Sequence, residues 1–229
     1  MNQIENKEII LDYSLGIRNM RVKENLYPLF QKLEEANLPK PNIVMWTDEK
    51  LEWKNAVINS FIDINLLDKL DPYQRDDDIY DVWIDLNSNE KINIKIGQSF
   101  EDRIVIIIVD KIMNLHNHSF CRNLFVSILS SLSNCETGRC DARYNDIYRY
   151  KFEGISKPYL GWIQYFNNKM IMERGGFESF ESNPLLKTER IHDGLLIQVG
   201  ESPYDAFTPE GEELLVRATR SLPPVRNNS

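Results

Sequence analysis

Six consecutive β-branched residues at positions 104–109 constrain the fold of this chain more than any other feature. A continuous apolar run of this kind predicts a central strand that is buried on both faces of a sheet, because a strand with one wet face alternates. Such a strand requires a layer of helices over the sheet. The segment 119–132 predicts one of them, with an apolar stripe formed by Leu124, Phe125, Ile128, Leu129 and Leu132.

The remaining elements are predicted mainly in blocks of one type. Helical spacing of apolar residues predicts a helix over 26–33 that stops at Asn37 and Pro39, and helical segments between Thr47 and Leu70. A closing helix follows Thr208 as its cap and Pro209 at its first position. Strands are predicted at 9–13, 80–86, 91–96, 146–152, 159–166, 169–172 and 194–199. The fold class expected is α+β: a mostly antiparallel sheet with helices packed on it, in a single domain spanning residues 1–229.

The sequence also predicts the positions of several turns and the burial of one strand. Hairpin turns are predicted at 87–90 and at Asn167-Asn168, and turn-rich interruptions at 38–41, 134–143 and 175–184. In the strand at 159–166, Trp162 and Phe166 share one face and Ile163 and Tyr165 the other, so we expect only one set to be buried against the main core. Gly161 before this pair is expected to permit close packing.

Localisation is predicted from the absence of targeting patterns and from the cysteines. No stretch approaches the roughly 18 apolar residues of a membrane helix, and the N-terminus has no signal-peptide pattern. The three cysteines, Cys121, Cys135 and Cys140, suit a reducing compartment and are expected to be thiols. A cytoplasmic protein without membrane contact is therefore predicted.

The net charge of −8 is concentrated in one part of the chain. Residues 60–102 contain 11 acidic and four basic residues, a balance of −7. An acidic protein repels phosphate backbones, so direct binding of nucleic acid is disfavoured and attraction to a basic partner is favoured.

Candidate metal and catalytic motifs are few. His116, His118 and Cys121, with Cys135 and Cys140, are the nearest approach to a metal constellation, but the cysteine spacing does not fit a structural zinc site, and semi-buried thiols in a loop-like setting are expected. Asp76, Asp77, Asp78 and Asp81 lack the spacing of a calcium loop. The chain has no Walker A loop, no G-x-G-x-x-G and no G-x-S-x-G. We therefore expect no cofactor and no metal.

The C-terminal third carries a resemblance to a known family. Residues 158–166 read Pro-Tyr-Leu-Gly-Trp-Ile-Gln-Tyr-Phe, and residues 194–206 form a glycine-led strand followed by Tyr204-Asp205. With Thr208-Pro209 and the ending at Leu222-Pro223, these segments resemble the immunity protein 52 family of bacterial polymorphic toxin systems. Gln198-Val199-Gly200 replaces the more threonine-rich strand that is typical there. The resemblance implies a cytoplasmic antidote to a toxin, often a nuclease of restriction-endonuclease fold, without catalysis.

The resulting hypothesis is a binding protein that blocks a cognate toxin with a basic surface. The acidic segment would compete with phosphates. Aromatic residues such as Trp162, Tyr165 and Tyr204 are further interface candidates, although most of the aromatic residues are expected in the core. Two alternatives are a hydrolase-like enzyme that uses carboxylates and His192, and an acidic inhibitor that mimics DNA. The residues expected to bind the partner are Asp76, Asp77, Asp78, Asp81, Trp83, Glu101 and Asp102.

Overall fold

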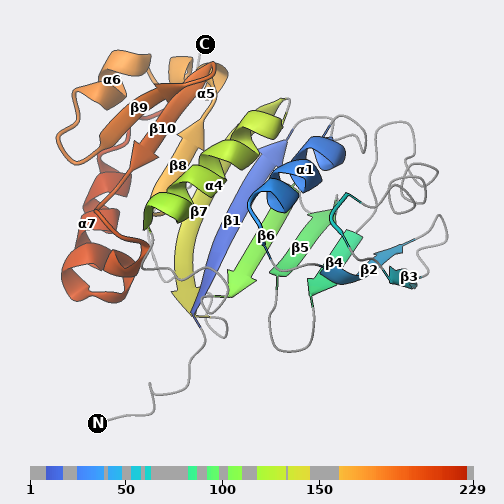
Figure 1. Cartoon of the computed structure of the whole chain (residues 1–229). Coiled ribbons are helices and arrows are strands. Elements are labelled where there is room, and N and C mark those ends of the chain that lie inside the picture. The colour runs from blue at the N-terminus through green and yellow to red at the C-terminus, as the bar shows by residue number, and fades with distance from the viewer. Residues whose placement is uncertain are drawn as a thin grey trace, which may run out of the picture. The chain divides into compact units, whose positions relative to one another are not determined.

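The computed structural model separates the chain into two compact units (Figure 1). The N-terminal unit is Tyr13–Cys135, and the C-terminal unit combines Met1–Asp12 with Glu136–Ser229. The prediction of a single domain over 1–229 remains a prediction. The structure describes residues 9–17, 25–38, 41–47, 53–57, 60–62, 82–86, 92–97, 103–109, 118–132, 134–144 and 160–225.

The N-terminal unit is built on an antiparallel sheet in the strand order β3-β2-β4-β5-β6-β1. Antiparallel pairing joins β3 to β2, β2 to β4, β4 to β5 and β5 to β6. The predicted strand at 104–109 is β6, which has a neighbour on each side. The bounds are β1 Ile9–Ile17, β2 Pro41–Thr47, β3 Trp53–Val57, β4 Val82–Leu86, β5 Ile92–Gly97 and β6 Arg103–Val109.

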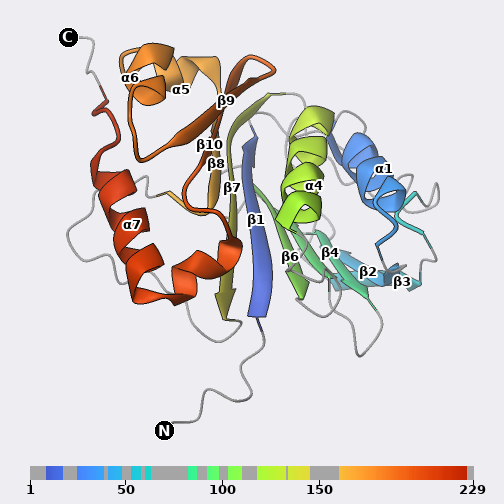
Figure 2. The ribbon, with the colours of Figure 1, turned by 60° about the vertical axis from the view of Figure 1, so that its left-hand side comes forward.

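Two helices lie side by side on one face of this sheet, α1 (Tyr27–Glu35) and α4 (His118–Ser131) (Figures 1 and 2). The ring of Tyr13 on β1 stacks on Phe125 of α4 with ring centroids 5.8 Å apart, and its hydroxyl donates to the carbonyl oxygen of Cys121 at 3.2 Å. Both predicted helices are therefore confirmed. The apolar stripe of α4 is also confirmed, because Leu124, Phe125, Ile128, Leu129 and Leu132 are all buried.

The prediction of helical segments between Thr47 and Leu70 is wrong for residues 53–57, which form β3. This strand pairs with β2, and its residues alternate between half-buried and exposed from Lys54 to Val57. The alternation has the period of a strand, whereas the apolar residues that suggested a helix were spread over a longer segment. Pairing with a neighbouring strand overrides a weak local helical pattern.

The C-terminal unit has a second antiparallel arrangement, in the order β7-β8-β10-β9. Its strands are β7 Cys135–Tyr144, β8 Ile163–Phe166, β9 Lys187–Ile191 and β10 Gly194–Gln198; Cys135 itself is assigned to the other unit. Its helices are α5 Asn168–Met172, α6 Phe177–Glu181, η3 Pro203–Phe207 and α7 Pro209–Arg220. The antiparallel α+β class is confirmed by both units.

Four local predictions in this unit are wrong in whole or in part. Residues 169–172 are part of helix α5 and not a strand, because the Asn167 side chain caps the helix by accepting from the Met170 N–H at 3.0 Å. Asn167-Asn168 is accordingly no hairpin turn. The expected loop at 134–143 is mostly strand β7, and α6 lies within the expected turn region at 175–184. The strand predicted at 146–152 falls outside the described residues.

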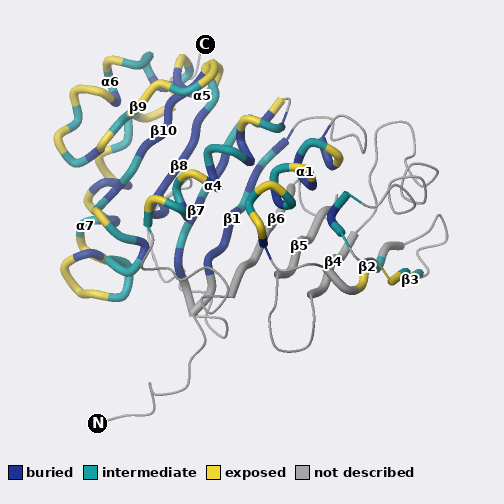
Figure 3. Tube along the Cα trace, viewed as in Figure 1, coloured by how far each residue is buried: buried dark blue, intermediate teal, exposed yellow. Residues whose placement is uncertain are grey.

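The core of the C-terminal unit lies between the sheet and its helices (Figures 2 and 3). Phe166 on β8 is fully buried, and its ring lies 6.0 Å from that of Phe180 on α6. Contrary to expectation, all four residues of β8 are buried, including Ile163 and Tyr165 on the face opposite Phe166. The core residues are Leu160, Phe166, Ile171, Phe180, Leu186, Leu195, Ile197, Val199, Leu215 and Ala218.

Helix α7 begins as the sequence predicts. The Thr208 side chain accepts from the Gly211 N–H at 3.1 Å, and Pro209 occupies the first turn, where its missing N–H is not needed. Leu215 and Ala218 face the core. None of the helices in the described part of the chain is long and apolar enough to cross a membrane.

Candidate partner-binding surface

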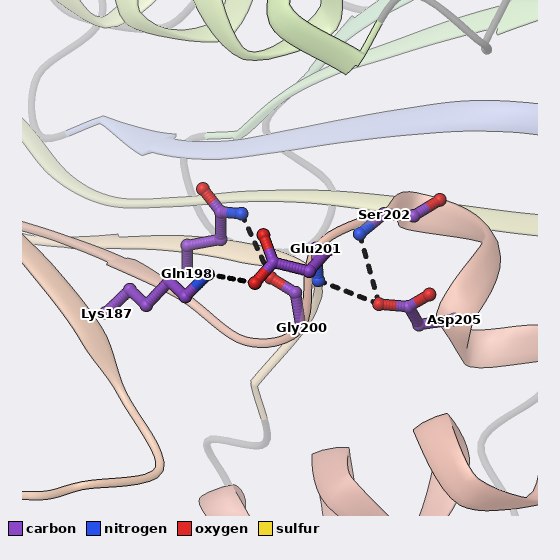
Figure 4. A network of polar contacts seen from close by, with 6 residues as sticks. All are labelled: Lys187, Gln198, Gly200, Glu201, Ser202 and Asp205. Carbon is purple, nitrogen blue, oxygen red and sulfur yellow. Dashed lines mark hydrogen bonds and ion pairs between the residues drawn. The ribbon is translucent and has the colours of Figure 1, made fainter.

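The segment that carried the family resemblance contains a turn organised by Asp205. One oxygen of its carboxylate, Oδ2, accepts from the backbone N–H of Glu201 at 2.8 Å and of Ser202 at 3.1 Å (Figure 4). The Ser202 hydroxyl oxygen accepts in turn from the Tyr204 N–H at 3.0 Å. Together these contacts form a capping box at the start of η3, so the turn between β10 and η3 has a defined shape.

Two glycines let the chain approach Asp205 closely. Gly200 has a φ of +77°, and a Cβ there would lie 2.5 Å from the Asp205 Oδ2. In helix α7, a Cβ on Gly211 would lie 2.0 Å from the Asp205 carbonyl oxygen. Both distances are too short for a side chain. Asp205 is therefore the point at which the turn, η3 and the first turn of α7 are joined.

The joined elements carry several exposed carboxylates. Glu201, Glu210, Glu212 and Glu213 are exposed, and residues 200–213 contain five acidic residues and no lysine or arginine. Lys187 on β9 forms an ion pair with Glu201, and Gln198 donates to the Gly200 carbonyl oxygen at 3.0 Å (Figure 4). The three glutamates of α7 also stabilise the positive end of the helix dipole. We call Glu201, Glu210, Glu212 and Glu213 the acidic surface.

Two aromatic side chains lie in η3, between Glu201 and Glu210 in the sequence. Tyr204 and Phe207, both in η3, have ring centroids 6.1 Å apart, and both residues are partly exposed. Large rings next to charges are enriched where proteins bind one another, because a ring buries much area with few rotatable bonds. Charge and aromatic area together suit a protein partner with a basic surface.

Replacing Asp205 with alanine is expected to loosen this turn. The substitution leaves the N–H groups of Glu201 and Ser202 without their acceptor, at a cost of about 1–2 kcal/mol in the free energy of unfolding. Amide hydrogen exchange at residues 201–205 should become faster, while exchange in α4 should stay unchanged. Equal exchange at residues 201–205 in the two proteins would show that Asp205 does not hold the turn.

Most of the partner-binding residues expected from the sequence are not among the residues that the structure describes. Asp76, Asp77, Asp78, Asp81, Glu101 and Asp102 lie outside the described residues. The backbone of Trp83 lies in β4, as predicted, and pairs with Met45 of β2 and Lys95 of β5. The assignment of these residues to a partner interface therefore stays a prediction.

Other candidate residues can be placed. All three cysteines are buried, and none of them is part of a disulfide. Cys135 and Cys140 lie in strand β7 and not in a loop. Within the described ranges, no three or more His, Cys, Asp or Glu residues are grouped so that they could hold a metal ion. His192 is exposed at the turn between β9 and β10, where its φ is +50°.

The sequence pattern predicted the start of α7 from Thr208 and Pro209, and it placed Tyr204 among the aromatic candidates. It gave the glutamates of the acidic surface no role in binding. The missed signal is the spacing Ser-x-x-Asp at Ser202 and Asp205, which is a variant of the capping-box pattern. That pattern predicts a short helix between β10 and α7.

The fold defines the protein as an antiparallel α+β protein. Among solved structures, the chain is similar to the "Pseudomonas aeruginosa T6SS protein PA0821", with a TM-score of 0.62 and 17% sequence identity over 93% of this chain and 73% of that chain. At this identity the similarity shows a shared fold. No family model and no curated protein matches the sequence, so the resemblance to immunity protein 52 stays a prediction.

Proposed function

We propose that this protein is an immunity protein, which binds a cognate bacterial toxin in the cytoplasm and neutralises it without catalysing a reaction. The observation that carries the proposal is the fold shared with a T6SS protein over 93% of the chain. The T6SS is a secretion apparatus, and a cell that secretes a toxin needs an antidote to it. The resemblance of residues 158–166 and 194–206 to an immunity family supports the same reading.

Charge indicates the kind of toxin. A nuclease must carry positive potential where it binds the phosphate backbone, and a negative surface on the antidote attracts that region over long range. The chain has a net charge of −8, and the acidic surface lies on a turn and helix fixed by Asp205. We therefore propose a toxin with a basic active face, such as a nuclease of restriction-endonuclease fold, that is blocked by occupation of that face.

Co-expression with the toxin encoded by the adjacent open reading frame tests the proposal. Cells that make the toxin alone should stop growing, and cells that make both proteins should grow. The purified pair should form a complex in which the toxin has lost its activity. Continued toxicity in the presence of abundant, folded antidote would rule out this pair.

Charge reversal tests the acidic surface within that complex. Replacing Glu210, Glu212 and Glu213 with lysine should lower the association rate constant about tenfold or more at low salt, because steering depends on the summed charge. The free energy of unfolding should fall by about 1–2 kcal/mol, since the favourable charges at the helix start are lost. Stopped-flow association at several salt concentrations gives the rate.

The matched control carries the same change in net charge elsewhere on the C-terminal unit. This control replaces three glutamates with lysine: Glu173 at the C-cap of α5, Glu178 in α6 and Glu189 in β9. A third variant replaces Asp76, Asp77 and Asp78 with lysine. The proposal for the acidic surface requires the α7 variant to be slowed more than the control. If the α7 variant and the control are slowed equally, the effect comes from net charge and not from the acidic surface. If the third variant is slowed most, the interface lies in the N-terminal unit.

A further inference from the structure

Strand β9 (Lys187–Ile191) forms the edge of the sheet in the C-terminal unit (Figure 1). It is paired with β10 on one side, and none of the described strands is paired with it on the other. An edge strand presents a row of backbone N–H and C=O groups that can pair with a strand of another chain. Whether β9 can do so depends on which of its backbone groups point outward.

The turn between β9 and β10 fixes the direction of these groups. Ile191 pairs with Gly194 across a turn of two residues, and at such a turn the flanking residues exchange both of their backbone hydrogen bonds. Hydrogen-bonded and non-hydrogen-bonded pairs then alternate along the antiparallel ladder. Thr188 and Arg190 are therefore in non-hydrogen-bonded pairs, and their backbone N–H and C=O groups point away from β10.

The described part of the chain supplies no partner for these outward groups. Its hydrogen bonds outside the helices and sheets include none to the backbone of Thr188 or Arg190. The Arg190 guanidinium donates to the Glu181 carboxylate at 2.7 and 3.0 Å and lies 4.5 Å from the centre of the Phe177 ring, both in α6. This side chain is thus held on the face of the sheet that carries the core residue Leu195, its partner on β10.

The charges of β9 complement a second copy of β9 in one register. In an antiparallel pair with a two-fold axis at Thr188, Lys187 of each copy lies opposite Glu189 of the other. These residues are exposed and occupy non-hydrogen-bonded pairs, where side chains approach most closely. Opposite charges and paired threonines both stabilise such contacts, whereas an axis at Glu189 or Arg190 places like charges opposite each other.

The existing ion pair of Lys187 leaves room for this contact. Its ammonium group is paired with Glu201, and the Lys187 side chain is 59% exposed. An ammonium group has three donors, so a second carboxylate can bind to it.

We propose that β9 is a dimerisation edge, at which the C-terminal units of two copies of this chain form one continuous antiparallel sheet with its two-fold axis at Thr188. This inference does not depend on the toxin. The strand has five residues, so the contact is small and the dimer should dissociate readily on dilution.

Sedimentation velocity of the full chain measures this association. Between about 1 and about 500 µM, the mass should rise from the 26.9 kDa of one chain toward twice that value. Thr188→Pro removes an outward N–H that β10 does not use, and proline is tolerated at such edge positions. The variant should therefore stay folded in urea titrations and dimerise about tenfold or more weakly. A chain that is monomeric at every concentration, or a dimer that Thr188→Pro does not weaken, overturns the proposal.

A charge exchange tests the register and keeps the proposal testable should Thr188→Pro fail to fold. Glu189→Lys places lysine opposite Lys187 twice and should weaken the dimer about tenfold, and adding Lys187→Glu should restore most of the loss. Glu35→Lys makes the same change in net charge at an exposed position of α1 and should alter the dimer constant less than about twofold.

Two further outcomes would contradict the proposal. Failure of the charge exchange to restore association overturns the pairing of Lys187 with Glu189. If the chain alone is monomeric but its complex with the toxin is weakened by Thr188→Pro, the edge pairs with a strand of the toxin and not with a second copy.

Discussion

Replacing Gly211 with alanine should lower the free energy of unfolding by about 3 kcal/mol, although alanine is the better helix former by about 1 kcal/mol. The added Cβ would lie 2.0 Å from the Asp205 carbonyl oxygen and 2.5 Å from its carbonyl carbon. These are backbone atoms and cannot rotate away. The helix must therefore move from η3, and the contacts that fix the acidic surface must be broken.

Urea unfolding followed by circular dichroism measures this loss. The control is Glu212→Ala, which changes the next residue of the same helix at an exposed position and should alter stability by less than about 0.5 kcal/mol. Gly211→Ala should also speed amide exchange at residues 201–208, and it should weaken any complex that uses the acidic surface. Equal stabilities of the two variants would contradict the close approach of α7 to Asp205.

Replacing Phe166 with alanine should cost about 3–5 kcal/mol, the range for removing a fully buried aromatic ring. The ring lies in the centre of the core of the C-terminal unit, beside Phe180, and the Arg174 guanidinium carbon is 5.9 Å from its centroid. Its removal leaves a cavity that strand β8 and helix α6 cannot both close.

An exposed residue of the same unit serves as the control for Phe166→Ala. Met172 in the neighbouring helix α5 is 58% exposed, so Met172→Ala should change the free energy of unfolding by less than about 1 kcal/mol. Phe166→Leu keeps most of the volume and should lose about 1–1.5 kcal/mol, which gives a measurable intermediate should the alanine variant not fold. A loss below about 1 kcal/mol for Phe166→Ala would mean that the core is arranged differently.

Elements with a strong local pattern were predictable. The β-branched run of β6, the apolar stripe of α4 and the cap and proline of α7 each fix their structure within a few residues. By contrast, β3 and α5 were assigned wrongly, since one is decided by pairing with β2 and the other by a single side-chain cap at Asn167. Neither the spacing of apolar residues nor the composition of the segment reveals the pairing with β2 or the cap at Asn167.

The candidate partner-binding surface was likewise predictable only in part. The sequence revealed an excess of acidic residues and a resemblance in residues 194–206, and from these it predicted a binding protein with a basic partner. Its choice of the residues around Asp76 rested on charge density alone. The turn held by Asp205 joins acidic residues from three elements, and a count of charges along the chain does not reveal that arrangement.

By itself, the sequence determined the fold class, the main helices and strands, and the sign of the protein's charge, because each of these follows from residue types at short spacing. Only the tertiary structure decided which side chains meet across long separations. The burial of both faces of β8 and the approach of Gly211 to Asp205 both depend on how strands and helices pack. Packing is a property of the assembled chain, so no local pattern encodes it.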